Sequence, residues 1–229
     1  MNRPIVESLE PVTLVGGGPV AARSLRAALA RAPRLVAADG GADRVLRAGL
    51  MPEAVIGDFD SISAAARAAI PPARLHPIAE QDSTDFDKAL RHIRAPLVLG
   101  LGFWGARMDH GLAALSVLAR YPDRACLLLA ETCLAFLAPP RLEIGLRPGD
   151  RLSLYPLGPV RGRSAGLRWP IEGIDFAPDG RIGTSNEVTE RRVTLEFDAP
   201  RMLVILPRGR LDAAVRALRP AARPDAHGG

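Results

Sequence analysis

The chain of 229 residues has little that would mark a membrane, secreted or nucleic-acid-binding protein. Its apolar runs are shorter than the roughly 18 residues that cross a bilayer, and no apolar segment follows a basic start as in a signal peptide. The net charge is +5, but the basic residues are scattered and no run of five or more occurs. We therefore expect neither a membrane nor a nucleic acid as a partner.

Cysteines and aromatic residues are also scarce. The two cysteines, Cys126 and Cys133, lie in an apolar stretch and do not have the spacing of a metal-binding CxxC pair. Free buried thiols suit a reducing compartment, so we expect a cytoplasmic protein. Aromatic residues make up only 4% of the chain, whereas hydrophobic residues make up 48%, which is enough for a large core.

Lysine is almost absent, because Lys88 is the only lysine among the 30 Lys and Arg residues. It lies in the segment 81–90, QDSTDFDKAL, next to Asp82, Asp85 and Asp87. A compact ammonium group with rotatable donors suits a phosphate contact, and arginine is not its equivalent. The position of this lysine therefore favours a phosphate-binding role over chance.

The first part of the chain alternates short apolar runs with helical patterns. This order predicts parallel βα units with helices covering the sheet, in which ligands bind beyond the carboxyl ends of the strands. The expected strands are 12–15, 35–38, 54–56, 75–79, 97–101 and 125–129. The expected helices are 20–31, 42–48, 83–93 and 108–120, the last with Leu112, Leu115 and Leu118 buried.

The pattern changes near Pro139 and Pro140. Beyond them, short strand-like runs alternate with turns rich in Gly, Pro and Asp, which predicts a small antiparallel β domain. The expected strands are 142–146, 151–155, 166–170, 188–197 and 202–206, followed by a terminal helix over 211–218. We therefore predict an α/β domain over 1–138, a β domain over 139–221 and a disordered tail over 222–229.

Two acidic clusters follow predicted strands. Asp58 and Asp60 come directly after the run 54–56, and Asp82 and Asp85 open the next helix. Carboxylates packed this closely repel one another unless a cation or a proton lies between them. Oxygen ligands on loops suit Mg²⁺, which takes its other ligands from water and substrate phosphates. The clusters therefore predict a site for a metal ion and phosphate.

Each acidic cluster also has a simpler explanation. Asp60 or Ser61 could be the N-cap of a helix, and the segment 82–85 could cap the next one, with Asp85 in its first turn. Asp85 and Lys88 are three residues apart on one helical face, where a surface ion pair is common. Two clusters at strand ends together with the only lysine favour the metal site.

Two further loops carry candidate binding residues. Gly16-x-Gly18-x-x-Ala21 fits the dinucleotide fingerprint, with Asp39 near the position of a ribose acid, but Pro19 removes one amide of the loop. We interpret these glycines as a tight turn with close approach of a ligand. In the second loop, Arg107 could neutralise phosphate, and Asp109 could cap the helix or reach substrate. His110 is more often a structural helix histidine.

In order and spacing, these motifs resemble the thiamine pyrophosphokinase (thiamine diphosphokinase) family from about Val12 to Leu206. The resemblance rests on Asp39-Gly-Gly-Ala, Gly57-Asp-Phe-Asp-Ser61, Gln81-Asp-Ser-Thr-Asp85-Phe-Asp-Lys88, Gly105-Ala-Arg-Met-Asp-His110, Gly166-Leu-Arg-Trp169-Pro and Gly183-Thr-Ser185-Asn186. It implies a Rossmann-like α/β domain with helices on both faces of the sheet, followed by a β-sandwich that binds thiamine. It also implies a homodimer with each active site at the subunit interface.

The resemblance implies transfer of diphosphate from ATP to thiamine with Mg²⁺, giving thiamine diphosphate and AMP. By motif, Asp58, Asp60 and Asp85 would hold Mg²⁺ and the triphosphate, and Lys88 and Arg107 would offset phosphate charge. Asp82 or Asp109 would orient or deprotonate the thiamine hydroxyl. Binding residues would be Asp39, Ser61 and Thr84, with Gln81, Trp169, Ser185 and Asn186 near thiamine.

Two positions depart from the family pattern. Ala106 stands where a second glycine is expected, and the turn 181–185 lacks an extra serine, which puts contacts at 181 or 183 in question. Two other functions remain as alternatives. One is a non-catalytic nucleotide or thiamine sensor on the same scaffold, and the other is a nucleotide-dependent oxidoreductase using the Gly16 turn.

Overall fold

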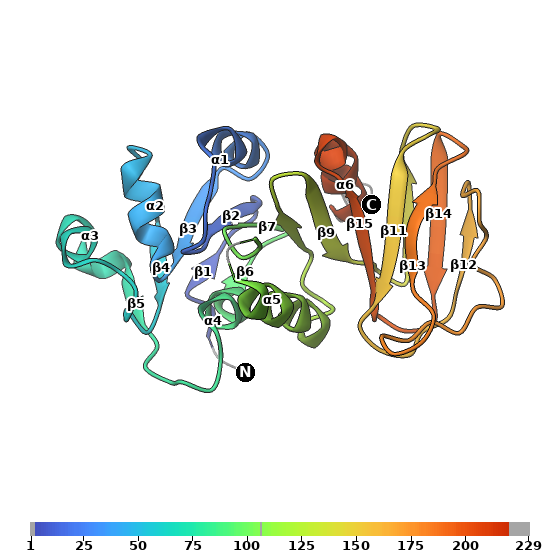
Figure 1. Ribbon diagram of the computed structural model, residues 1–229. Coiled ribbons are helices and arrows are strands. Elements are labelled where there is room, and N and C mark those ends of the chain that lie inside the picture. The colour runs from blue at the N-terminus through green and yellow to red at the C-terminus, as the bar shows by residue number, and fades with distance from the viewer. Residues whose placement is uncertain (1–2, 106, 220–229) are drawn as a thin grey trace, which may run out of the picture.

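The computed structural model describes residues 3–105 and 107–219. The predicted tail over 222–229 and the departure at Ala106 lie outside these residues. A ten-stranded sheet runs through the whole molecule, and its strands follow the order β13-β11-β15-β9-β8-β7-β2-β3-β4-β5. The first half of the chain supplies the parallel end of this sheet, and the second half supplies the antiparallel end (Figure 1).

The parallel strands other than the edge strand are mostly apolar and almost entirely buried, because helices cover both faces of this part of the sheet. The parallel strands are β2 (Val12–Val15), β3 (Arg34–Ala38), β4 (Ala54–Gly57), β5 (Leu75–Pro77), β7 (Val98–Leu101) and β8 (Cys126–Leu129). The helices are α1 (Ala22–Leu29), α2 (Gly41–Arg47), α3 (Ala64–Ala69), α4 (Asp85–His92) and α5 (Met108–Arg120), and η1 (Pro72–Arg74) is a 3₁₀ turn. A short parallel pair, β1 (Val6–Glu7) with β6 (Ile93–Arg94), lies beside the main sheet.

The two faces of the parallel sheet have separate cores. On one face, Leu14 and Ile56 pack with Leu90 of α4 and Leu118 of α5. The neighbouring residues of the same strands, such as Val15 and Val55, point to the other face. There they pack against α1, α2 and α3. Figure 1 shows α4 and α5 together on the opposite side of the sheet from α1. The six predicted strands and four predicted helices of this half are confirmed, with ends shifted by at most two residues.

The strand order places a topological switch point between β2 and β7. The chain continues from β2 to β3, β4 and β5 on one side, and from β7 to β8 on the other. The loops that follow β2, β3, β4 and β7 therefore leave the sheet at the same edge, where ligands bind in open α/β sheets. Asp39, Asp58 and Asp60 lie on the loops after β3 and β4, and Asp109 follows the loop after β7. Asp82 and Asp85 instead follow β5, in the connection to α4 and in the first turn of that helix.

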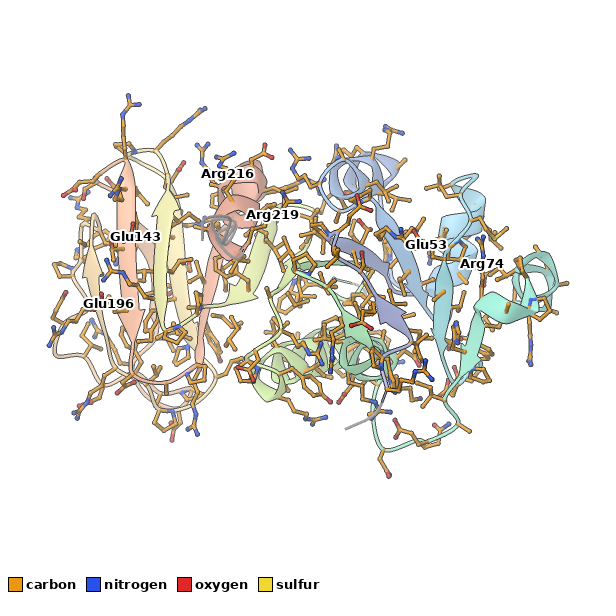
Figure 2. The ribbon with its side chains drawn as sticks, turned by 180° about the vertical axis from the view of Figure 1, so that it is seen from behind. Glu53, Arg74, Glu143, Glu196, Arg216 and Arg219 are labelled. Atoms are coloured by element: carbon orange, nitrogen blue, oxygen red, sulfur yellow. The ribbon has the colours of Figure 1, made fainter. Side chains whose placement is uncertain are left out.

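The second half forms a sandwich on the antiparallel end of the large sheet. The strands β9 (Cys133–Leu137), β11 (Arg151–Pro156), β13 (Gly183–Glu187) and β15 (Met202–Pro207) belong to that sheet. A second sheet holds β10 (Arg141–Gly145), β14 (Arg192–Phe197) and β12 (Gly162–Ala165). Their alternating buried residues share one core, which α6 (Leu211–Leu218) completes, and the 3₁₀ turn η2 (Arg208–Arg210) connects β15 to this helix. Figure 2 shows Glu143 and Glu196 of this sheet at the opposite end of the molecule from Glu53 and Arg74.

Several predicted elements in this half are corrected by the structure. The sequence prediction missed β9, a strand that pairs with both β8 and β15, so the sheet is continuous across the proposed boundary at residue 138. That boundary stays a prediction. The range 166–170 is a turn and not a strand, because Gly166 has a φ of +81°. The range 188–197 is interrupted by a turn, and β14 begins only at Arg192.

One helix face was also assigned wrongly. Leu115 and Leu118 of α5 are buried as predicted, but Leu112 is 57% exposed. The buried stripe of α5 begins at Gly111 and continues through Ala114 and Leu115, which leaves Leu112 outside it. Among the described residues, no helix has the length and apolar character needed to cross a membrane.

Candidate active site

Three aspartates meet where β3 and β4 end. Asp39, Asp58 and Asp60 each place a carboxylate oxygen within 4.8 Å of the others. Asp39 is 1% exposed and accepts hydrogen bonds from the backbone N–H groups of Ser61 (3.0 Å) and Ile62 (3.2 Å). These bonds hold the loop after β4 against the end of β3, so that carboxylates from two strands share one place.

The backbone around these aspartates is strained. Asp39 has a φ of 41° and Phe59, between Asp58 and Asp60, has a φ of 66°. Non-glycine residues in this region cost of order 1–3 kcal/mol and persist where the surrounding structure imposes them. Asp60 and Ser61 do not cap a helix, because the N-cap of α3 is Ser63, whose hydroxyl accepts from the N–H of Ala66. The capping explanation for this cluster is therefore wrong.

The second acidic cluster opens α4 and faces the first. Thr84 is the N-cap, and its hydroxyl accepts from the N–H of Asp87 at 3.3 Å. This places Asp85 in the first turn, where Oδ1 is buried and has no hydrogen-bond partner among the described residues. A buried carboxylate oxygen without a partner is costly unless a ligand completes it. The capping explanation is confirmed for Thr84, but it does not account for Asp85.

Lys88 connects the two clusters from beneath. Its Nζ lies 2.6 Å from Oδ2 of Asp58 and 3.8 Å from Oδ1 of Asp85, and the residue is 1% exposed. The alternative of a surface ion pair is therefore wrong, because the lysine is one of the largest fully buried side chains. Lys88 lies behind the carboxylates and not on the cavity wall, and its role as a phosphate contact stays a prediction.

Helix α4 is held in place by a second buried carboxylate. Asp87 accepts from the hydroxyl of Tyr121 at 2.7 Å and pairs with Arg120, both at the end of α5. Asp87 lies between Asp85 and Lys88 in the sequence, so this contact fixes the rotation of α4. It thereby directs Asp85 and Lys88 toward the ends of β3 and β4.

Tyr121→Phe is expected to lower the free energy of unfolding by about 1–2 kcal/mol, because a hydrogen bond to a buried carboxylate is lost. Urea denaturation measures this change. The control is Tyr155→Phe at the other tyrosine of the chain, which is expected to change stability by less than about 0.5 kcal/mol. Equal effects of the two substitutions would contradict the contact with Asp87.

The carboxylates differ in how strongly they hold protons. Burial raises the pKa of Asp39 to about 7, and the neighbouring Asp60 adds to this rise. Burial and the charge of Asp58 raise the pKa of Asp85. Partial burial would raise the pKa of Asp58 too, but the hydrogen bond and charge of Lys88 outweigh it and the net shift is downward. The site contains four carboxyl groups, from Asp39, Asp58, Asp60 and Asp85, but only one lysine, Lys88. Negative charge is therefore in excess when these acids are ionised.

This set of residues fits a divalent cation. The excess charge is negative, the donors are hard carboxylate oxygens on loops, and Oδ1 of Asp85 has no partner among the described residues. Mg²⁺ is the ion that such ligands suit, with water and phosphate completing its shell. The close group formed by Asp39, Asp58 and Asp60 adds Asp39 to the predicted ligands Asp58, Asp60 and Asp85.

The raised pKa values predict how stability without Mg²⁺ depends on pH. An acid whose pKa is higher in the folded state destabilises the fold as the pH rises from its unfolded value, near 4, to its folded value. For Asp39 this window runs from about pH 4 to about pH 7. The raised pKa of Asp85 adds a destabilisation of the same sign above pH 4. Acids with a lowered pKa, such as Asp58, change the stability mainly below pH 4, where they become protonated. Burial lowers the pKa of His76, so the contribution of this residue to stability rises with pH instead of falling.

In EDTA and a His76→Gln background, the urea midpoint is therefore expected to fall between pH 5 and pH 7.5. Mg²⁺ is expected to reduce this fall, because a bound cation favours the ionised carboxylates. A midpoint that rises over this range would contradict the assigned shifts.

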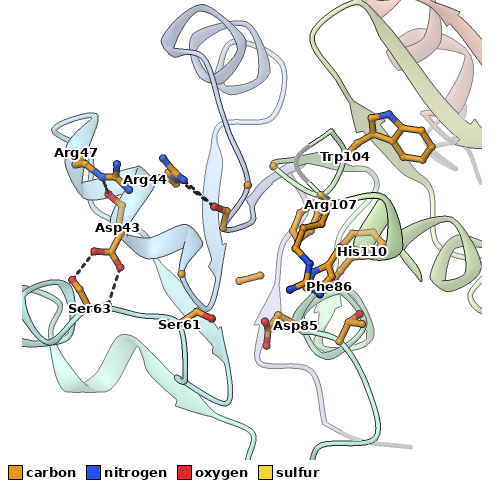
Figure 3. A pocket seen from close by; sticks show the side chains of 17 residues that line it. Asp43, Arg44, Arg47, Ser61, Ser63, Asp85, Phe86, Trp104, Arg107 and His110 are labelled. Carbon is orange, nitrogen blue, oxygen red and sulfur yellow. Dashed lines mark hydrogen bonds between the residues drawn. The ribbon is translucent and has the colours of Figure 1, made fainter. Parts of the chain in front are cut away.

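A cavity of about 470 Å³ lies beside the acids, at the edge of the sheet. Ser61, Thr84 and Asp85 line it together with Arg107 and His110, all from predicted motifs. Figure 3 shows Asp43, Arg44 and Arg47 of α2 on one side of the cavity and Phe86, Arg107 and His110 on the other. A cavity with acids at one end and arginines around it suits a metal-bound polyphosphate.

Sequence reasoning missed Arg44 and Arg47. Both line the cavity from α2, where the guanidinium of Arg44 donates to the carbonyl of Gly17 at 3.2 Å and that of Arg47 to the carbonyl of Asp43 at 3.1 Å. A signal was present, since these arginines are three residues apart on the helix that directly follows Asp39-Gly-Gly. In a chain with so many arginines, that signal did not stand out.

The glycines of the first loop serve packing between loops. A Cβ atom on Gly16 would lie 2.5 Å from the ring of Phe103, and one on Gly18 would lie 2.5 Å from the carbonyl oxygen of Gly102. Phe103 in turn packs on Phe86 of α4, with ring centroids 4.5 Å apart. These two glycines therefore permit close contact between protein loops, while Gly17 and Gly18 border the cavity.

The remaining residues of the first half lie around this cluster. Gln81 donates to Oδ2 of Asp58 at 3.2 Å, and Asp82 is exposed. Arg107 and Asp109 form an exposed ion pair at 2.6 Å, and the hydrogen bond from Arg107 lowers the pKa of Asp109 to about 2. Asp109 does not cap α5, whose N-cap is Arg107. A paired carboxylate with so low a pKa is a weak proton acceptor.

The candidates of the second half line a different cavity, of about 300 Å³. Trp169 is 53% exposed there, and the side chain of Asn186 exchanges hydrogen bonds with the backbone of Trp169 at 2.7 and 3.2 Å. Ser185, with a φ of 61°, lies on the same wall. Within one chain, the structure does not bring Gln81 to this cavity, because β13 lies at one end of the large sheet and β4 near the other.

Comparison with known families agrees with both halves of the chain. A family model described as the catalytic domain of thiamin pyrophosphokinase matches residues 25–128. A second, described as the vitamin B1 binding domain of thiamin pyrophosphokinase, matches residues 141–202. The chain belongs to the thiamin pyrophosphokinase family. The resemblance stated from the motifs is therefore confirmed.

Relatives within the thiamin pyrophosphokinase family cover the chain to different extents. Thiamine pyrophosphokinase 1 of Arabidopsis thaliana is 35% identical over 136 residues, which is 52% of this chain and 51% of the relative. The match thus spans about half the length of that relative. Thiamine pyrophosphokinase 1 of Oryza sativa subsp. japonica is 29% identical over 204 residues, or 74% of this chain and 77% of the relative.

Two solved structures share the fold of this chain. Thiamin pyrophosphokinase from Candida albicans superimposes with a TM-score of 0.73 at 16% identity, covering 90% of this chain and 93% of that one. A protein from Lactobacillus plantarum gives a TM-score of 0.72 at 26% identity, covering 87% and 99%. The predicted fold class, a mostly parallel α/β sheet followed by a small antiparallel sandwich, is confirmed.

Proposed function

We propose that this protein is a thiamine pyrophosphokinase, which transfers the diphosphate of ATP to the hydroxyethyl group of thiamine. The observation that carries the proposal is the buried Oδ1 of Asp85, which has no hydrogen-bond partner among the described residues and faces the group formed by Asp39, Asp58 and Asp60. Membership of the family, together with a cavity lined by arginines next to these acids, supports the same function. A protein that only bound ligands would not need so costly an acidic cluster.

In this proposal, Asp58, Asp60 and Asp85 hold Mg²⁺, with Asp39 beside them. When bound, Mg²⁺ supplies positive charge to the phosphate oxygens and a fixed template for their orientation. Lys88 holds Asp58 and Asp85 at fixed positions through its ion pairs. Arg44, Arg47 and Arg107 contribute charge-assisted hydrogen bonds to the triphosphate from the cavity wall.

The reaction forms a bond between the thiamine hydroxyl oxygen and the β-phosphorus of ATP. The bond from the β-phosphorus to the oxygen that bridges it to the α-phosphorus breaks, and AMP leaves with that oxygen. Such transfers depend mainly on positioning and charge neutralisation, and little on covalent help from the protein. The hydroxyl proton passes to an acceptor for which Asp82 and Asp109 remain the candidates, although the ion pair with Arg107 disfavours Asp109.

We further propose that thiamine binds in the cavity beside Trp169 and that the protein is a homodimer. Trp169, Ser185 and Asn186 lie at the far end of the sheet from Asp58 and Asp85. A thiamine bound at Trp169 therefore meets the acids only if a second copy brings its own acidic edge to that cavity. Gln81 would then contact thiamine from the acidic side.

Trp169→Ala is expected to raise the KM for thiamine by about 10-fold while changing the KM for ATP less than about 2-fold. The exposed ring offers a cation–π contact to the cationic thiamine, and such contacts contribute about 1 kcal/mol or more. Trp169→Phe is expected to recover part of the loss. Equal changes in both KM values would instead indicate that Trp169 only supports the fold.

The function is tested by incubating the protein with ATP, thiamine and Mg²⁺ and measuring products by chromatography. We expect thiamine diphosphate and AMP in equal amounts, and neither product without Mg²⁺. Tight binding of ATP and thiamine without AMP would identify a sensor instead. Affinity for NADH would favour the oxidoreductase alternative. The two free cysteines, one of them fully buried, support a reducing compartment such as the cytoplasm.

A further inference from the structure

The connection between β5 and α4, residues 78–84, is a loop that its own backbone does little to hold. Figure 1 shows it extending away from the end of β5 before it returns to α4. The N–H of Ile78 donates to the carbonyl of Gly57 at 2.7 Å. Beyond this bond, residues 79–83 make no backbone–backbone hydrogen bond within the part of the chain that the structure describes. The shape of such a segment depends on its side chains.

Glu80 accepts the hydrogen bonds that hold this loop together. One carboxylate oxygen, Oε2, accepts from the backbone N–H of Asp82 at 3.0 Å, and the other, Oε1, accepts from the hydroxyl of Ser83. Oε1 also pairs with Arg91 at 2.6 Å, which ties the loop to α4. The hydrogen bonds from Ser83 and Arg91 lower the pKa of Glu80, so its carboxylate is ionised and accepts from all three donors at neutral pH.

The loop that Glu80 holds carries the residues assigned to the thiamine side of the reaction. Gln81 and Asp82 directly follow Glu80, and both are exposed. Gln81 also donates to Oδ2 of Asp58 at 3.2 Å, so the loop contacts the acidic cluster as well. Glu80 itself lines neither the cavity beside the acids nor the one in the second half of the chain. Its effect on a substrate therefore passes through its neighbours.

We propose that Glu80 is a positioning residue, which holds Gln81 and Asp82 in the arrangement that receives thiamine and contacts neither substrate itself. This inference rests on the proposed function for the identity of the ligand. A carboxylate that accepts three hydrogen bonds restricts the shapes of the loop before binding, so less conformational freedom is lost when thiamine binds. Without Glu80, thiamine itself would have to order the exposed loop, and its affinity would fall.

Glu80→Ala tests this role, with Glu53→Ala as the control. The two side chains are 32% and 35% exposed and each pairs with an arginine, but Glu53 lies at the opposite end of β4 from Asp58. Calorimetry with Mg²⁺ measures the affinity for ATP, and that for thiamine in the presence of an ATP analogue with a methylene group between the α- and β-phosphorus. We expect Glu80→Ala to weaken thiamine binding by about 10-fold and ATP binding by less than about 2-fold, and Glu53→Ala to change neither.

Glu80→Gln is the conservative variant. Its amide keeps one oxygen as an acceptor but places an NH₂ group against one of the donors, so part of the thiamine affinity is expected to be recovered. Hydrogen exchange provides a readout that needs no substrate. Exchange at the N–H of Asp82 is expected to become faster in Glu80→Ala, because this group loses its acceptor, and to stay unchanged in Glu53→Ala.

Unchanged thiamine affinity in Glu80→Ala, or equal losses for thiamine and ATP, would overturn the positioning role. Unchanged exchange at Asp82 in Glu80→Ala would do the same. Because binding does not require turnover, a protein that binds thiamine in this Glu80-dependent way without releasing AMP would contradict the proposed function and leave the positioning role standing. Failure of the unchanged protein to bind thiamine would contradict both.

Discussion

Replacing Asp85 with asparagine is expected to lower AMP release at least 100-fold while the protein stays folded. Loss of a residue that only supports a metal ligand typically costs about 10–100-fold, so loss of a ligand itself is expected to cost at least about 100-fold. The fold is expected to persist because Asp85 contributes no net stability when ionised. Burial and the charge of Asp58 raise its pKa, and its Oδ1 has no hydrogen-bond partner among the described residues.

The stability of Asp85→Asn without Mg²⁺ is therefore expected to equal or exceed that of the unchanged protein at pH 7.5. Asp212→Asn is the control, because Asp212 also lies in the first turn of a helix, α6, but pairs with Arg31 away from the cavity. This control is expected to keep its activity. Near-normal AMP release by Asp85→Asn would remove Asp85 from the metal site.

Lys88→Met is expected to destabilise the fold by about 3–5 kcal/mol at pH 7 and to abolish activity. Methionine keeps the length of the side chain but leaves Asp58 and Asp85 without their positive partner, and breaking a buried ion pair leaves an uncompensated charge. Arg91→Met, on the same helix, is the control, since Arg91 forms a partly exposed pair with Glu80 at 2.6 Å. This control is expected to cost about 1 kcal/mol or less.

The destabilisation by Lys88→Met is also expected to depend on pH. Lys88 lowers the pKa of Asp58, so the stability that it provides is present above the unfolded pKa, near 4, and is lost as the pH falls below it. Urea denaturation at pH 7 and pH 4 is therefore expected to show the larger difference between variant and unchanged protein at pH 7. Equal differences at both values would contradict a charge pair.

The fold of the first half could be predicted from sequence because its elements obey local rules. Strands buried on both faces have nearly continuous apolar runs, and a glycine turn and a helix follow most of them. Strand β9 was missed because its runs of Leu and Ala resemble a continuation of β8, and only its antiparallel pairing with β8 and β15 in the folded sheet defines it. The prediction for Leu112 was wrong because Leu112, Leu115 and Leu118 are three residues apart, whereas an α-helix has 3.6 residues per turn. A row of residues at every third position therefore leaves the buried face.

The candidate site could be predicted only in part. The acids at the ends of β3 and β4 meet because the carboxyl ends of parallel strands lie at one edge of the sheet. The alternation of strands and helices along the sequence is enough to predict this. The burial of Lys88 beneath the acids depends on how α4 packs against β4, which spacing along the chain does not specify. The separation of Trp169 from Gln81 depends on strand order, which likewise emerges only from the folded sheet.

The most direct test of the whole account uses ATP labelled with ³²P at the β-phosphate, in a single turnover with thiamine and Mg²⁺. In the unchanged protein, the label is expected to move to thiamine diphosphate while AMP forms without label. In Asp85→Asn, the label is expected to remain in ATP. Label in ADP or inorganic phosphate in place of thiamine diphosphate, or equal transfer by both proteins, would contradict a diphosphate transfer organised by these aspartates.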